Sequence, residues 1–200
     1  MDELCKRLGM SRGKLREELI AAEAWGAVEM RPGDGTYVQP LDFYTPIRGL
    51  VLYSVALDKK NFDLYYDLRT QLEAAFWEDA VARLTAEDKD ELERIVQRAE
   101  SRLRGDPVEI PHREHRNLHL LTFSRLDNPF IVGLLRAYWD AYEAVGLHRY
   151  FDYGYYEEMW SSHKEMVEAI MAGRYREGRR VLIHHFTLLS DRLRSQRGRG

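Results

Sequence analysis

Four histidines are the residues of this sequence whose type and spacing point most directly to chemistry. His115 and His119 stand four residues apart, and His163 and His185 follow in later segments. Each falls among apolar residues at helical spacing, so each ring is expected to face the core of a helical protein. A buried polar ring without a partner costs about 1–3 kcal/mol, and four converging imidazoles avoid this cost by binding a divalent cation. The pattern predicts a metal site; the alternative interpretation is four separate core histidines, each with its own partner.

Arg69 is the second candidate site residue. It lies beside Leu68 and Leu72 in a segment with helical periodicity, so its stem is expected to be partly buried. A guanidinium near a core needs an anionic partner. Two anionic partners are possible. One is Glu73, four residues further on, and the other is the carboxylate of a bound ligand that also coordinates the metal.

The segments that must position these residues are predicted to be helical. After a boundary around residues 39–48, which contain two prolines, the periodicity predicts helices near 46–58, 61–84, 86–104, 112–126, 129–149, 155–173 and 175–196. Thr85 with Asp88 is a variant of the capping box, and Asn128-Pro129 supplies an N-cap followed by proline at the first helical position. Residues 41–200 are therefore expected to form an all-helical bundle, and the fold class is mainly α.

The first 40 residues have a different organisation. A turn at Gly9 separates a helix over 2–8 from a second helix near 11–25, and a Pro-Gly-Asp-Gly turn then joins strands near 27–30 and 36–39. This order is that of a winged helix-turn-helix, whose second helix enters the major groove of DNA. Five positive charges and no acid lie around the start of that second helix, where they can neutralise phosphates: Lys6, Arg7, Arg12, Lys14 and Arg16.

Composition limits the class of protein. The chain has 200 residues, of which 44% are hydrophobic and 32% charged, as in a folded globular protein. Its net charge of −3 excludes a uniformly basic nucleic-acid coat but is compatible with a local basic patch. Cys5 is the only cysteine, which excludes an internal disulfide and suits a reducing compartment. No secretory signal and no apolar run of about 20 residues is present, so we expect a cytoplasmic protein without a membrane span.

The N-terminal segment LCKRLGMSRGKLREELIAAEAWGAVEMRPGDGTYV resembles the DNA-binding domain of GntR-family transcription regulators. In that family the domain opens with a further helix and strand, so the resemblance implies either that the numbered chain begins late or that the winged helix over residues 1–40 is truncated. Gly13-Lys14 replaces the Thr-Pro that is common in the family. The resemblance implies DNA contacts from Arg12, Lys14, Arg16 and Gly35, with Ser11 and Arg31 beside them.

The rest of the chain resembles the all-helical FCD effector domain of the FadR branch of that family. The family's metal-binding members carry Asp-x-x-x-His, followed nine residues after the histidine by Asn-Pro. Here His119 takes the histidine position, and His115 stands where the family has aspartate. The resemblance implies that His115, His119, His163 and His185 bind a divalent ion. It also implies that Arg69 contacts a carboxylate effector. Because a neutral imidazole replaces a carboxylate, zinc or nickel is expected rather than manganese or magnesium.

These observations predict a transcription regulator rather than an enzyme. We expect a homodimeric repressor that binds a palindromic operator in double-stranded DNA and responds to a small organic acid through a bound metal. One alternative is a metal-dependent hydrolase, although no glutamate stands in an HExxH-like spacing. The other alternative is a regulator in which the metal is purely structural.

Overall fold

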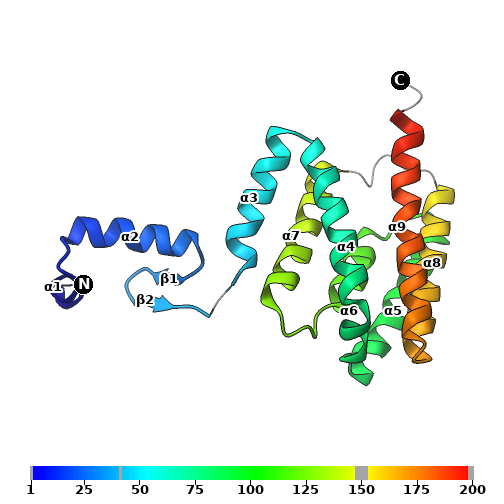
Figure 1. Ribbon diagram of the computed structural model, residues 1–200, viewed down its shortest axis with the longest axis horizontal. Coiled ribbons are helices and arrows are strands. Elements are labelled where there is room, and N and C mark those ends of the chain that lie inside the picture. Colours follow the sequence, from blue (N-terminus) through cyan, green and yellow to red (C-terminus); the bar gives the residue numbers. More distant parts are fainter. Residues whose placement is uncertain (1, 41, 147–152, 198–200) are drawn as a thin grey trace.

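The computed structural model describes residues 2–40, 42–146 and 153–197. In these residues a small N-terminal module stands at one end of a helical bundle (Figure 1). The module comprises α1 (Asp2–Leu8), α2 (Arg12–Ala24), β1 (Val28–Arg31) and β2 (Gly35–Val38). The bundle comprises α3 (Tyr44–Leu57), α4 (Lys60–Ala82), α5 (Ala86–Leu103), α6 (His112–Thr122), α7 (Pro129–Val145), α8 (Tyr153–Met171) and α9 (Tyr175–Arg197). The prediction of a mainly α fold is confirmed.

Local hydrogen bonds hold the N-terminal module together. Ser11 is the N-cap of α2, and its Oγ accepts a hydrogen bond from the backbone N–H of Lys14 at 3.2 Å. The two strands form an antiparallel hairpin in which Arg31 lies opposite Gly35. The carboxylate of Glu23, on α2, accepts a hydrogen bond from the Met30 backbone N–H of β1 at 2.7 Å. This bond fixes the hairpin against the second helix.

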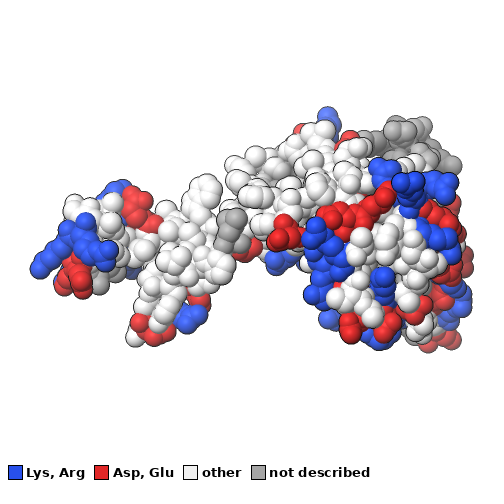
Figure 2. Space-filling model, turned by 60° about the horizontal axis from the view of Figure 1, so that its bottom comes forward, with Lys and Arg blue, Asp and Glu red and all other residues white. Residues whose placement is uncertain are grey.

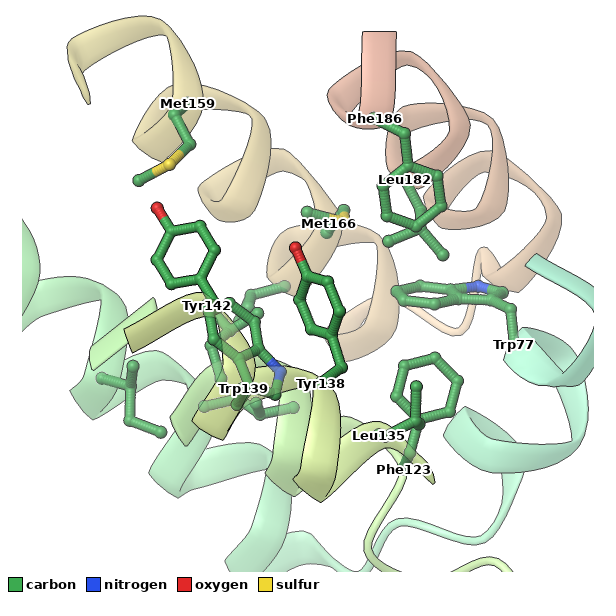
Figure 3. Close-up of a cluster of buried hydrophobic side chains, with 14 of the residues drawn as sticks. Trp77, Phe123, Leu135, Tyr138, Trp139, Tyr142, Met159, Met166, Leu182 and Phe186 are labelled. Atoms are coloured by element: carbon green, nitrogen blue, oxygen red, sulfur yellow. The ribbon is translucent and has the colours of Figure 1, made fainter. Parts of the chain in front are cut away.

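The bundle is built around one core of aromatic and aliphatic side chains. Figure 3 shows this core, in which rings from α4 and α7 meet side chains from α8 and α9. Trp77, Tyr138 and Trp160 are each at most 2% exposed. Burying a large apolar side chain contributes about 1.5–3 kcal/mol, so this core holds the helices in register. The four histidines lie on α6, α8 and α9, and each of these helices contributes side chains to the core.

The two predicted capping motifs are confirmed. Thr85 and Asp88 form the capping box of α5, and the Oδ1 of Asn128 accepts from two backbone N–H groups at the start of α7. The prediction for α6 is wrong at its other end, because the helix ends at Thr122 rather than near residue 126. A turn follows there, in which the Ser124 hydroxyl donates to the Leu121 carbonyl at 2.8 Å.

The helix that follows the N-terminal module, α3, is fixed tightly to α7. A Cβ added at Gly133 would lie 3.1 Å from the backbone nitrogen of Tyr44, so the absence of a side chain permits this close approach. Asp140 of α7 accepts hydrogen bonds from the Tyr44 hydroxyl, from Arg48 Nε at 2.6 Å and from Arg116 Nη1 at 2.8 Å. One carboxylate therefore joins α3, α6 and α7.

The surface over α3 is unusually apolar. Leu50, Tyr53 and Leu57 are 62%, 65% and 69% exposed, and Leu64 at the start of α4 is 67% exposed. Figure 2 shows a largely uncharged surface between the mixed charges of the N-terminal end and the charged face of the bundle. In the part of the chain that the structure describes, no helix has the length and apolar character needed to cross a membrane.

Candidate metal centre

The structure brings the four predicted histidines together. His115 and His119 project from α6, His163 from α8 and His185 from α9. One ring nitrogen of each can be chosen so that all four atoms lie within 4.8 Å of one another. Nε2 of His119 and Nε2 of His163 are 3.1 Å apart. Residues separated by 70 positions in the sequence thus share one small volume.

Burial sets the protonation state of these rings. The four histidines are between 0% and 7% exposed. Burial, together with the neighbouring rings and Arg69, lowers the pKa of His115, His163 and His185 well below the usual value. The rings are therefore neutral at pH 7, and neutral imidazole is the form that coordinates metals.

Several buried ring nitrogens of the cluster have no hydrogen-bond partner among the described residues. Nε2 of His115 and Nδ1 of His185 are among them. Buried polar atoms are nearly always paired, so atoms of this kind need an explanation. A cation that accepts their lone pairs supplies one.

Glu73 of α4 orients His119 from behind. Its Oε2 lies 2.9 Å from Nδ1 of His119 and its Oε1 accepts from Arg69 Nε at 2.7 Å. With Nδ1–H donating to the carboxylate, Nε2 of His119 keeps its lone pair, and this atom lies 3.1 Å from Nε2 of His163 and 3.2 Å from Nη2 of Arg69. Burial opposes ionisation of Glu73, but the charge of Arg69 and the hydrogen bonds from Arg69 and His119 outweigh it and hold its pKa below the usual value.

Arg69 is buried at the edge of the same cluster. Its Nη2 lies 2.9 Å from Nδ1 of His119, and its guanidinium packs against the rings of Tyr138 and Phe186. Of the two partners considered from the sequence, Glu73 is the one that Arg69 contacts in this structure. Spacing within α4 indicated that ion pair. The contact of Glu73 with His119 was not predicted, because it joins two different helices.

Two tryptophans complete the wall of the cluster. The ring centres of Trp139 and His115 are 4.6 Å apart, and those of Trp160 and His163 are 4.9 Å apart. The indole Nε1–H groups of both tryptophans are buried and have no acceptor among the described residues. Two tryptophans whose indole donors lack an acceptor in the described part of the chain therefore pack against the cluster.

The donor set fits a borderline divalent cation. Zinc–imidazole bonds of about 2.0–2.1 Å place the four nitrogens of a tetrahedron about 3.4 Å apart. The observed limit of 4.8 Å lies close enough to this spacing for small ring rotations to close the site. Four neutral nitrogen donors without a carboxylate suit zinc or nickel better than manganese or magnesium.

The residues predicted to contact DNA are exposed on the N-terminal module. They lie at the start of α2 or on the hairpin, and they are Ser11, Arg12, Lys14, Arg16, Arg31 and Gly35. Three of the four cations make surface ion pairs: Arg12 with Asp2, Lys14 with Glu18 and Arg31 with Glu29. Exposed pairs of this kind contribute about 0–1 kcal/mol, so phosphates could replace the carboxylates at little cost.

Comparison with known proteins identifies the family. The FCD domain family matches residues 64–188, which include Arg69, Glu73 and all four histidines. FCD domains can bind a metal ion, and the histidine cluster lies within the matched region. The chain is 27% identical over 202 residues to the Uxu operon transcriptional regulator of Escherichia coli strain K12, an alignment that covers 96% of this chain and 76% of that protein.

Solved structures share the fold. The Streptococcus agalactiae GntR protein has a TM-score of 0.68 with 20% identity, over 94% of this chain and 85% of that one. The E. coli protein McbR/YncC has a TM-score of 0.58 with 20% identity, over 98% of this chain and 85% of that one. With the winged-helix order of elements and the matched helical domain, these likenesses agree on one assignment: the chain belongs to the GntR family of transcription regulators and carries their FCD domain.

Proposed function

We propose that this protein is a repressor that senses a small carboxylate through a divalent metal, zinc or nickel. Residues 1–40 would bind operator DNA and residues 41–200 would bind the metal and the effector. The observation that carries the proposal is the cluster of His115, His119, His163 and His185, whose donor atoms lie within 4.8 Å of one another in the core.

The role of Arg69 follows from its chemistry. Its guanidinium lies beside the cluster, and Nε and Nη2 contact Glu73 and His119. An arginine has five N–H donors, so the Nη1 group offers two more to a ligand. A carboxylate bound to the metal would reach this side chain and gain a charge-assisted hydrogen bond.

The exposed face of α3 supports a homodimer. Leu50, Tyr53 and Leu57 form an apolar stripe along this helix, and Leu64 of α4 is also exposed. Apolar patches of this kind on soluble proteins mark interaction sites. We propose a second copy of the chain as the partner, because a palindromic operator requires two DNA-binding modules related by two-fold symmetry. In analytical ultracentrifugation, Tyr53→Glu should convert dimers to monomers; a dimer that survives contradicts this assignment.

Metal content tests the site. The purified protein should carry about one zinc or nickel ion per chain by elemental analysis, and His185→Ala should lose most of it. His184→Ala is the matched control, because His184 is the neighbouring residue but is exposed and outside the cluster. Equal metal content in both variants would contradict the proposal.

Ligand binding separates sensing from the alternatives. Carboxylates should raise the unfolding temperature of the metal-loaded protein and have little effect on the metal-free protein, since a ligand stabilises only the state that binds it. A structural metal would show no such metal-dependent stabilisation. The regulators among the relatives favour sensing over hydrolysis, and an operator-binding assay with and without the effector tests the repressor function directly.

A further inference from the structure

In the metal-free protein, the charges around the histidine cluster cancel. Among the described residues, the buried charged side chains of this region are Arg69, Glu73 and Glu114. Arg69 and Glu73 neutralise each other at 2.7 Å. Oε1 of Glu114 lies 3.1 Å from Nε of Arg102, on α5, and its buried Oε2 has no hydrogen-bond partner among the described residues. The two pairs leave a net charge of zero.

All four proposed ligands are neutral imidazoles, so a bound divalent ion adds two uncompensated positive charges. Charge is costly in a buried site unless an opposite charge accompanies it. The hydrogen-bonding groups also favour an anion: the indole N–H groups of Trp139 and Trp160 are buried donors without acceptors among the described residues. Arg69 adds further donors. Such a site has no net negative charge, because the carboxylate of Glu73 is already paired with Arg69 and His119.

We infer that the metal-loaded site selects small dianions, with two carboxylates, over monocarboxylates. One carboxylate would coordinate the metal, and the second would take the donors of Arg69 and the indoles. A dianion neutralises the metal completely, whereas a monoanion leaves one buried positive charge. This inference rests on the proposed metal-dependent carboxylate sensing and specifies the charge of the ligand.

A pair of probes that differ by one charge tests the inference. Succinate and its monoamide, succinamate, have the same carbon chain, but one carboxylate is replaced by an amide. In calorimetric titration of the metal-loaded protein at pH 7.5, we expect succinate to bind at least tenfold more tightly. The same comparison with malonate and malonamate controls for chain length. Equal affinities within each pair would overturn the inference.

His115→Asp tests the cause of the preference. The new carboxylate places one negative charge at the cluster, so the preference for succinate over succinamate should fall at least fivefold, with affinities compared per bound metal. Trp160→Phe is a second variant that keeps an aromatic ring and removes one donor; it should weaken succinate binding about threefold to tenfold. An unchanged preference in His115→Asp contradicts the charge argument.

The outcomes distinguish this inference from the proposed function. If both members of a pair bind equally and only in the presence of metal, carboxylate sensing stands and the dianion preference fails. If no carboxylate binds to the loaded protein, the sensing function itself is refuted. Inorganic phosphate in the same titration identifies the kind of dianion: binding as tight as that of succinate assigns the site to compact dianions, and weaker binding assigns it to dicarboxylates.

Discussion

Replacing Glu73 by glutamine should destabilise the protein far more than its small change in volume indicates. The Arg69–Glu73 pair has an N–O distance of 2.7 Å, and its side chains are only 4% and 0% exposed. Glu73→Gln leaves the guanidinium buried without its anion. Coulomb attraction at about 4 Å with an effective dielectric constant of 20 is about 4 kcal/mol. Breaking a buried pair by removing one partner costs about 3–5 kcal/mol.

The same helix offers a control. Asp79 and Arg83 also stand four residues apart with an N–O distance of 2.9 Å, but their side chains are 53% and 47% exposed. Asp79→Asn should cost less than about 1 kcal/mol. For a chain of this length 1 kcal/mol corresponds to about 2–4 °C in Tm, so Glu73→Gln should lower Tm by about 10 °C and Asp79→Asn by less than about 4 °C.

Thermal and urea unfolding of the metal-free variants measure the difference. If Glu73→Gln and Asp79→Asn change the unfolding free energy equally, burial does not govern the strength of this pair and the reasoning is refuted. A double variant, Arg69→Met with Glu73→Leu, gives a second check. It replaces both charges by apolar groups and should recover much of the lost stability, because no charge is left unpaired.

Three other outcomes follow from the packing and the titrating groups. Gly178→Ala would place a Cβ 2.9 Å from Trp77, so it should cost about 1–3 kcal/mol in urea unfolding, whereas Gly49→Ala, with nothing within 4 Å, should gain up to about 1 kcal/mol. A hydrogen bond from Arg125 lowers the pKa of Asp88 to about 2. The ionised Asp88 carboxylate therefore stabilises the fold above about pH 4, and this stabilisation is lost between about pH 4 and 2. In unfolding curves measured against pH, Asp88→Asn should abolish this part of the acid sensitivity. Burial lowers the pKa of the clustered histidines, so below about pH 6.5 the unfolded chain binds more protons than the folded chain. The free energy of unfolding of the metal-free protein should then fall by up to about 1.4 kcal/mol per histidine per pH unit. A free energy of unfolding that stays constant between pH 7 and 5 would contradict this.

Local signals in the sequence were sufficient for most of the fold. The N-caps Ser11, Thr85 and Asn128 act within three residues, so their helix starts could be read directly. The end of α6 could not be predicted in this way. The apolar spacing continues through Phe123 and Leu126, and both are buried, although the helix has already ended. Burial alone does not distinguish a helical residue from a packed turn.

The site was predictable in its members but not in its contacts. Apolar periodicity placed each histidine on a core face, and the family resemblance joined them into one set. The distance between His119 and His163, and the carboxylate of Glu73 behind His119, depend on how α4, α6 and α8 pack. No spacing within one helix encodes such a contact. The ion pair of Glu73 with Arg69 was predictable because both residues lie on α4.

The carboxylate of Asp140 links the helix that carries His115 and His119 to the helix that follows the N-terminal module. Arg116, which it binds, is the residue after His115 on α6, while Tyr44 and Arg48 lie at the start of α3, just beyond the N-terminal module. A ligand that moves α6 must therefore alter contacts that hold α3. Thermodynamic linkage makes any such effect reciprocal: the factor by which the ligand changes operator affinity equals the factor by which the operator changes ligand affinity. Operator DNA would thus act as an effector of the histidine cluster, as the ligand acts on DNA binding.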